Sequence, residues 1–298
     1  MPSLSGCEVA VTSTRILLVL FAAASYIPWA YPGWDLWLPR TWIRPRVRPV
    51  MLLVGDSLTE KGTLPQMNGW VTLLQYETKR SLHIVPRGLS GYNTRWYLKY
   101  GVPSIRSELS RGAYTPAVVT IWLGANDAAL PNGSAKAQHV PLAVYKENLV
   151  SLVHAFQEMA PNAGILLITP PYVDDEVQEK WAWRSTRRGH VALSNAVTAT
   201  YARACVETAH ELRLPSLDLH TSFSNLTTWT RKQMLVDGLH LSARGNAFMY
   251  EQLKAKVDMA FPDVSRKSKR LLFPESKHLM ESDPWNSTPV RGDARDEP

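Results

Sequence analysis

The stretch VGDSLTE, residues 54–60, follows the apolar residues VMLL at positions 50–53 and precedes the polar sequence KGTLPQMNG. An apolar run of this length indicates a buried strand, and Gly, Asp and Ser are residues that favour turns. Taken alone, the stretch is explained by a strand that ends in a turn containing Ser57. Whether Ser57 has a further role depends on what lies at the ends of the other predicted strands.

Four further apolar runs of strand length occur along the chain, and segments with helical periodicity lie between them. The runs are LHIVP (82–86), AVVTIW (117–122), GILLIT (164–169) and LPSLDL (214–219). The helical segments are residues 69–80, 141–160, about 187–212 and 243–259, and Ser242 is the predicted N-cap of the last one. Continuously apolar strands that alternate with helices indicate a parallel sheet covered on both faces. The sequence therefore predicts an α/β fold, a three-layer sandwich with a central parallel sheet of about five strands and a flavodoxin-like arrangement.

Composition divides the chain into three predicted parts. Residues 50–260 carry all the predicted strands and helices, and form the predicted α/β domain. Residues 261–298 are polar, mixed in charge and poor in periodicity, which predicts a disordered tail. Residues 1–49 contain an apolar segment, followed by a linker rich in Pro, Trp and Arg.

The apolar segment, residues 16–27, is shorter than the roughly 18 residues expected of a membrane span. It suits the hydrophobic region of a signal peptide, and the small residues AAAS at 22–25 would suit cleavage. The aromatic residues between positions 26 and 37 would suit a membrane anchor instead. Three interpretations stay open: the segment is a signal peptide, a membrane anchor, or neither. The first two allow membrane association through this segment.

Localisation signals in the sequence conflict. Sequons at Asn132, Asn225 and Asn286 fit a domain in the secretory pathway. Four arginines at positions 40–48 follow the apolar segment, and for an uncleaved anchor they favour a cytoplasmic domain. A protein of the secretory pathway or one associated with a membrane is the prediction, with the cytoplasm as the alternative.

Charge and cysteine content exclude several classes of protein. The formal net charge of +7 over 298 residues is modest, and no nucleic-acid-binding motif accompanies the arginine cluster, so nucleic acid is not a predicted partner. Cys7 and Cys205 offer neither a disulfide framework nor metal-ligand spacing. No metal or organic cofactor is predicted, and the sequence does not indicate an oligomeric state.

In open parallel α/β sheets, functional sites lie beyond the carboxyl ends of the strands. Four loops are expected there, namely GDSLTE (55–60), RGLSGYNTRW (87–96), LGAND (123–127) and MLVDGLHLSARGN (234–246), the last just before the final helix. Each loop alone is common in proteins of any function. Their joint occurrence where one site would need them indicates that they form a single site.

The four loops hold the groups that nucleophilic catalysis by a serine requires. Such a serine needs a base and an acid that orients the base. His240 can take the proton of Ser57, and Asp237, three residues earlier, can hold the imidazole. The backbone N–H groups of Ser57 and Gly91 and the side-chain amide of Asn126 would stabilise a developing oxyanion.

These loops resemble the sequence blocks of the GDSL, or SGNH, hydrolase superfamily. GDSLTE is similar to its first block, GLSGYNTR to the second, GAND to the third and DGLHLS to the fifth. The pairing of GDSLTE with GLSGYNTRW resembles the isoamyl acetate-hydrolysing esterase branch. The resemblance covers about residues 50–260. One departure is visible, since Pro86 and Arg87 precede Gly88 where relatives often carry an asparagine.

The resemblance implies a serine ester hydrolase with a Ser57–Asp237–His240 triad and an oxyanion hole of Ser57, Gly91 and Asn126. The branch favours small-molecule acyl esters of short chain as substrates. Alternatives on the same scaffold are a lipase or lysophospholipase, an acyltransferase, and a noncatalytic membrane-associated binding protein. Asp127 is a candidate for orienting the Asn126 loop. Candidate substrate contacts are Trp96, Trp122, Tyr172, Trp181 and Trp183.

Overall fold

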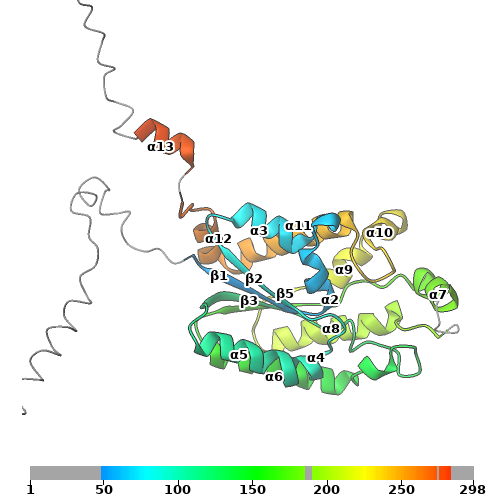
Figure 1. Cartoon of the computed structure of the whole chain (residues 1–298). Coiled ribbons are helices and arrows are strands. Elements are labelled where there is room, and N and C mark those ends of the chain that lie inside the picture. Colours follow the sequence, from blue (N-terminus) through cyan, green and yellow to red (C-terminus); the bar gives the residue numbers. More distant parts are fainter. Residues whose placement is uncertain (1–47, 185–189, 274, 283–298) are drawn as a thin grey trace, which may run out of the picture. The chain divides into compact units, whose positions relative to one another are not determined.

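The computed structural model describes residues 48–184, 190–273 and 275–282. Within them, five parallel strands form one sheet in the order β2-β1-β3-β4-β5 (Figure 1). The strands are β1 (Val50–Gly55), β2 (His83–Gly88), β3 (Pro116–Trp122), β4 (Gly164–Ile168) and β5 (Ser216–Leu217). In the middle of β1, Leu52 pairs with Val85 of β2 and Val119 of β3. The predicted parallel sheet of about five strands is confirmed.

Alternate residues of the strands face two separate apolar clusters, one on each side of the sheet. On β1, Met51 and Leu53 belong to the first cluster, whereas Leu52 and Val54 belong to the second. Side chains of a strand alternate between its faces, so a strand that is covered on both faces must be apolar throughout. This explains why the strand runs were visible in the sequence without alternation of polar residues.

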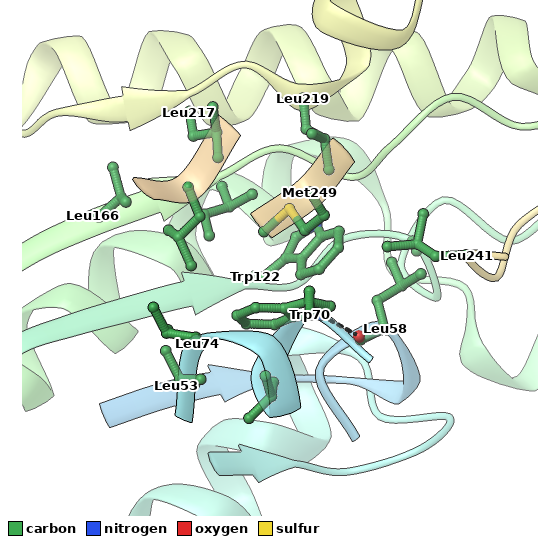
Figure 2. Packing of buried hydrophobic residues seen from close by; sticks show 14 of the residues in the cluster. Leu53, Leu58, Trp70, Leu74, Trp122, Leu166, Leu217, Leu219, Leu241 and Met249 are labelled. Carbon is green, nitrogen blue, oxygen red and sulfur yellow. Dashed lines mark hydrogen bonds between the residues drawn. The ribbon is translucent and has the colours of Figure 1, made fainter. Parts of the chain in front are cut away.

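Helices that pack on the first cluster cover one face of the sheet (Figure 1). They are α3 (Trp70–Thr78), α9 (Leu219–Ser224), α10 (Thr228–Met234), α11 (Ala243–Ala260) and α12 (Pro262–Ser268). Figure 2 shows Trp70 of α3 and Trp122 of β3 packed beside Met249 of α11. The two indole rings meet edge to face with their centroids 5.9 Å apart.

Helices on the other face pack on the second cluster and complete the predicted three-layer sandwich (Figure 1). They are α5 (Val102–Ser110), α6 (Leu142–Met159) and α8 (Asn195–Glu211), with a π-helical turn, η3 (Tyr97–Gly101), leading into α5. Tyr145 of α6 and Tyr201 of α8 stack in a tilted pair at 5.1 Å between ring centroids.

The predicted helices are present, with small differences at their ends. Ser242 caps α11 as predicted, and its hydroxyl accepts a hydrogen bond from the Gly245 N–H at 3.2 Å. Helix α8 begins at Asn195, later than its periodicity suggested, and the first part of the expected segment, residues 187–189, lies outside the described residues. Helix α7 (Asp175–Arg184), a polar helix, is not among the elements that the sequence predicts.

The ordered domain continues past residue 260. Helix α12 follows α11 directly, and its Val264 is 8% exposed within the first apolar cluster. Ser265 donates a hydrogen bond to Asp258 of α11. The prediction of a disordered tail from residue 261 therefore does not hold for residues 262–268. A short helix with one buried apolar residue has too little periodicity to be visible in the sequence. A further helix, α13, spans Ser276–Ser282.

Residues 1–47 lie outside the described residues, and with them the predicted signal peptide or anchor. Among the residues that are described, no helix combines the length and the apolar character that crossing a membrane requires.

Candidate active site

Ser57 lies at the turn where β1 enters a single helical turn, α2 (Ser57–Glu60). Asp56 caps this turn, since its Oδ1 accepts a hydrogen bond from the Leu58 N–H at 2.9 Å. From the other side, the Trp70 indole N–H donates to the Leu58 carbonyl at 3.0 Å (Figure 2). Ser57 is 7% exposed. Its position is therefore fixed both by the end of a buried strand and by a buried aromatic ring.

The loop with Asp237 and His240 lies between α10 and α11 and is closed by a bridge between Leu235 and Leu241. Asp237 Oδ1 accepts hydrogen bonds from the N–H groups of His240 and Leu239, at 2.8 and 3.1 Å. The other carboxylate oxygen, Oδ2, is 2.7 Å from His240 Nδ1. One oxygen thus shapes the loop, while the second orients the imidazole.

The opposite side of the imidazole reaches the serine. His240 Nε2 is 2.9 Å from Ser57 Oγ, which completes a chain of hydrogen bonds from Asp237 to Ser57. Burial opposes ionisation of Asp237, but its bonds to His240 and to the two loop amides outweigh burial and hold the pKa of Asp237 well below its usual range. The carboxylate is therefore ionised at neutral pH and can accept a hydrogen bond from the Nδ1–H of His240.

Asn126 lies in the loop after β3 and links two other loops of the site. Its Nδ2 donates to the Tyr92 carbonyl at 2.9 Å and to Asp56 Oδ2 at 3.3 Å. The neighbouring Asp127 is fully buried and accepts a hydrogen bond from the N–H of Thr94 at 3.0 Å. The loops after β1, β2 and β3 are thus joined by hydrogen bonds that Asn126 donates and Asp127 accepts.

Burial has a large effect on the two aspartates of this network. It raises the pKa of Asp56 to about 7, with the bond from the Leu58 N–H acting in the opposite direction and the nearby charge of Asp127 adding to the rise. Burial likewise raises the pKa of Asp127 to about 7, against the hydrogen bonds from Thr94. Both carboxyl groups therefore titrate close to neutral pH in the folded protein.

Gly91 follows β2 with φ at +79°, a backbone conformation that side chains disfavour. Its carbonyl accepts a hydrogen bond from Gln138 Nε2 at 3.0 Å, and a Cβ at this position would lie 3.2 Å from the same nitrogen. Gln138 itself belongs to a short 3₁₀ turn, η4 (Lys136–Gln138). Gly91 is thereby held in place by a side chain from outside the four sequence blocks.

A pocket of about 310 Å³ brings the predicted site residues together. Its wall includes Ser57, Gly91, Asn126, Asp237 and His240. Apolar side chains form another part of the wall, namely Ala135, Trp181, Ala192, Leu193 and Leu239. The remaining lining residues are polar, namely Lys61, Ser90, Gln138 and Gln178. In the described part of the chain, no group of three His, Cys, Asp or Glu side chains is arranged to hold a metal ion.

Residues 53–248 match the GDSL-like lipase/acylhydrolase family. The chain belongs to this family. A GDSL esterase/lipase of Arabidopsis thaliana is 37% identical over 211 residues, which cover 71% of this chain and 86% of the relative. The isoamyl acetate-hydrolyzing esterase 1 homolog of Bos taurus is 35% identical over 253 residues, covering 84% and 95%. The resemblance to the isoamyl acetate esterases is confirmed, and the protein is a carboxylic ester hydrolase.

The fold of this GDSL hydrolase also matches solved structures. An acetyl xylan esterase superposes with a TM-score of 0.55 at 17% sequence identity, covering 70% of this chain and 99% of that one. At this identity the likeness concerns the fold, and it agrees with the three-layer α/β sandwich.

One expectation about the loops of the GDSL hydrolase is wrong. The Asp237–His240 loop does not follow a strand, because the last strand ends at Leu217 and two helices, α9 and α10, intervene. The loop reaches the site from the end of α10 instead. The other three loops do follow β1, β2 and β3, as predicted.

The aromatic candidates for substrate contact fall into different environments. Trp181 lines the pocket. Trp122 is a core residue, Trp183 is exposed, and neither lines the pocket. Gln138 and Gln178 do line it, and sequence reasoning missed both, because they belong to no motif and lie on elements whose position depends on the tertiary fold.

Proposed function

We propose that this GDSL hydrolase is a serine esterase for small acyl esters, with Ser57 as nucleophile, His240 as general base and Asp237 as the orienting acid. The observation that carries the proposal is the chain of hydrogen bonds described above. Its two links measure 2.7 Å from Asp237 to His240 and 2.9 Å from His240 to Ser57. Both lie within the range expected of a nucleophile, its base and the group that orients the base.

In the acylation step, Ser57 Oγ attacks the ester carbonyl while His240 Nε2 takes the hydroxyl proton. The imidazolium that forms is stabilised by the ionised carboxylate of Asp237 at Nδ1. The tetrahedral intermediate then collapses, and His240 gives its proton to the leaving alcohol. The product of this step is an acyl-enzyme on Ser57.

The oxyanion is proposed to lie between the N–H groups of Ser57 and Gly91 and the Nδ2 group of Asn126. Both hydrogens of that amide have acceptors in the free enzyme, Tyr92 O at 2.9 Å and Asp56 Oδ2 at 3.3 Å. The bond to Asp56 is long and therefore weak. We infer that the oxyanion replaces Asp56 as acceptor, while the bond to Tyr92 keeps the amide oriented.

In the deacylation step, water attacks the acyl group from the side vacated by the alcohol. His240 accepts a proton from this water and returns one to Ser57 Oγ. The carboxylic acid leaves, and the triad is restored to its initial protonation state.

The size of the pocket supports small esters as substrates. Its volume of about 310 Å³ is at the lower end of the range for ligand pockets, roughly 300–1,000 Å³. The wall from Ala192, Leu193 and Leu239 offers a short apolar surface to an acyl or alkyl group. The bovine relative is named as a homolog of an isoamyl acetate-hydrolyzing esterase, and isoamyl acetate is a small ester of this class.

The test is a panel of p-nitrophenyl esters from acetate to palmitate, hydrolysed by the wild type and by Ser57→Ala. We expect the highest kcat/KM with short acyl chains, and a loss on the order of 10⁶ in kcat for the variant. Ser151→Ala, which removes an exposed serine of α6 that does not line the pocket, is the matched control and should retain activity. Near wild-type turnover by Ser57→Ala would refute the mechanism, and a preference for palmitate would refute the substrate class.

A further inference from the structure

Gln178 is a buried residue of α7 that contacts the loop of Asp237 and His240. The side chain is 5% exposed, and its Nε2 donates a hydrogen bond to the main-chain carbonyl of Asp237 at 3.1 Å. It also lines the pocket that contains Ser57. Neither the sequence blocks nor the proposed mechanism uses this residue.

The same loop is packed directly against the residue that precedes α7. The Asp174 N–H donates to the Gly238 carbonyl at 2.9 Å. Gly238 has φ at +85°, and a Cβ there would lie 3.0 Å from the Asp174 carbonyl oxygen and 3.3 Å from Gln178 Nε2. Only glycine allows this close approach, so α7 and the loop form one packed unit.

The stability of the fold does not account for a glutamine at position 178. Its Oε1 is buried and has no hydrogen-bond partner among the described residues. An unsatisfied buried acceptor is unfavourable, and an apolar side chain of similar volume would avoid this cost. Among the described residues, the side-chain amide of Gln178 makes one hydrogen bond, which Nε2 donates to the Asp237 carbonyl.

We propose that Gln178 is a positioning residue for the acid of the triad. This inference rests on the proposed function, because it assigns Gln178 a role through Asp237 and His240. By fixing the carbonyl of Asp237, Gln178 restrains the backbone from which the carboxylate reaches His240 Nδ1.

The geometry explains why this restraint acts on catalysis. Asp237 Oδ1 is engaged by the amides of its own loop, so a rotation of the Asp237 backbone would move both carboxylate oxygens together. Oδ2 would then move away from His240 Nδ1. A displacement of about 1 Å in a catalytic group can cost on the order of 10² in rate.

The experiment compares Gln178→Met and Gln178→Glu with the wild type. Both variants keep the approximate volume of the side chain and lose the donor to Asp237 O. We expect kcat to fall about 10- to 100-fold, with KM changed less than about threefold. The low-field NMR resonance of the proton between His240 Nδ1 and Asp237 should shift or broaden. The melting temperature of Gln178→Met should stay within about 3 °C of the wild-type value.

Glu179→Met serves as the control, because Glu179 is the next residue of α7 and is exposed. It should leave kcat and the low-field resonance unchanged. Wild-type kcat in Gln178→Met, or a fall in kcat with an unchanged resonance, would overturn the inference. Should Gln178→Met fail to fold, Gln178→Glu decides by the same two measurements, and failure of both to fold would assign Gln178 a structural role instead.

Failure of the inference is distinguishable from failure of the proposed function. If Ser57→Ala is inactive and the Gln178 variants behave as wild type, the triad stands and only the positioning role is lost. If Ser57→Ala retains its activity, the proposed function itself fails.

Discussion

Both amide hydrogens of Asn126 are donated to hydrogen bonds in the free enzyme, one to the Tyr92 carbonyl and one to Asp56 Oδ2. The orientation of the amide therefore depends in part on Asp56. We expect Asn126→Ala to lower kcat by about 10² to 10³, the usual effect of losing one donor to an oxyanion. Steady-state kinetics with p-nitrophenyl acetate would measure the loss, with Asn132→Ala, an exposed asparagine, as control. A rise in KM at unchanged kcat would show instead that Asn126 binds substrate without stabilising the transition state.

Asp127 provides a test by pH, because burial raises its pKa to about 7 in the folded chain. An unfolded aspartate titrates near 3.9. Between these values the folded state binds more protons than the unfolded state, so the free energy of unfolding falls as pH rises. Asp127→Asn removes this uptake of a proton. The stability advantage of the wild type over Asp127→Asn should therefore shrink by about 2–3 kcal/mol from pH 5 to pH 8.

Urea unfolding of the two proteins at several pH values measures this difference. Parallel profiles for wild type and variant would mean that Asp127 does not titrate in this range. Asp56 is still present in the variant, but its pKa falls somewhat when the charge of Asp127 is removed, so the difference between the two curves includes this change at Asp56.

At the scale of residues, the sequence allows a specific prediction where chemistry limits the choice of side chain. Ser57, Asp237 and His240 could be paired because nucleophilic catalysis needs those three types, and their loops carry recognisable motifs. Gln138 and Gln178 could not be found in this way. A glutamine amide that holds a backbone carbonyl has no fixed spacing in sequence, and its role exists only once the tertiary fold places it there.

Trp70 connects three elements around Ser57. Its indole N–H donates to Leu58 of α2, and its backbone N–H donates to Asn246 Oδ1 of α11 at 3.2 Å. Trp70→Phe removes the first bond and leaves a cavity beside Trp122. We expect a destabilisation of about 2–3 kcal/mol and a melting temperature lower by roughly 5–10 °C.

Thermal unfolding followed by circular dichroism measures this loss, and Tyr76→Phe on the exposed side of α3 is the control. At 25 °C the Trp70→Phe variant should keep kcat within about tenfold of wild type, because the Asp56 cap of α2 remains. A variant as stable as wild type would show that the Trp70 bond to Leu58 has no energetic importance.

Elements were predictable from the sequence in proportion to their burial. Strands β1 and β3 are apolar along most of their length because both faces are covered, and this pattern needs no tertiary information. Helix α7 is polar and α12 is short, so neither has a periodicity that distinguishes it from a loop. Their packing against the loop of Asp237 and His240 and against α11 is a property of the folded chain.

At the scale of the whole molecule, parallel topology brings together groups that are far apart in sequence. His240 and Ser57 are 183 positions apart, yet lie 2.9 Å from each other. The order β2-β1-β3 sets the first three loops side by side, as the rule for open α/β sheets predicts. The fourth loop obeys a different constraint, because it depends on how α10 and α11 pack on the sheet.

The folded domain extends beyond the end of α11 at Ala260. Phe261 packs on the start of β4, where a Cβ on Gly164 would lie 2.3 Å from its ring, and Val264 is buried against the first apolar cluster. A chain that ends at Ala260 loses both side chains from the core. Burying an apolar side chain contributes about 1.5–3 kcal/mol, and Phe261 is only partly buried, so we expect the free energy of unfolding to fall by about 2–4 kcal/mol. The melting temperature should then fall by roughly 5–15 °C.

A chain that ends at Ser282 retains α12 and should melt as the full-length protein does. The substitution Val264→Asp in the full chain should reproduce most of the loss in melting temperature. Equal melting temperatures for the chains ending at Ala260 and Ser282 would instead place the boundary of the folded domain at residue 260.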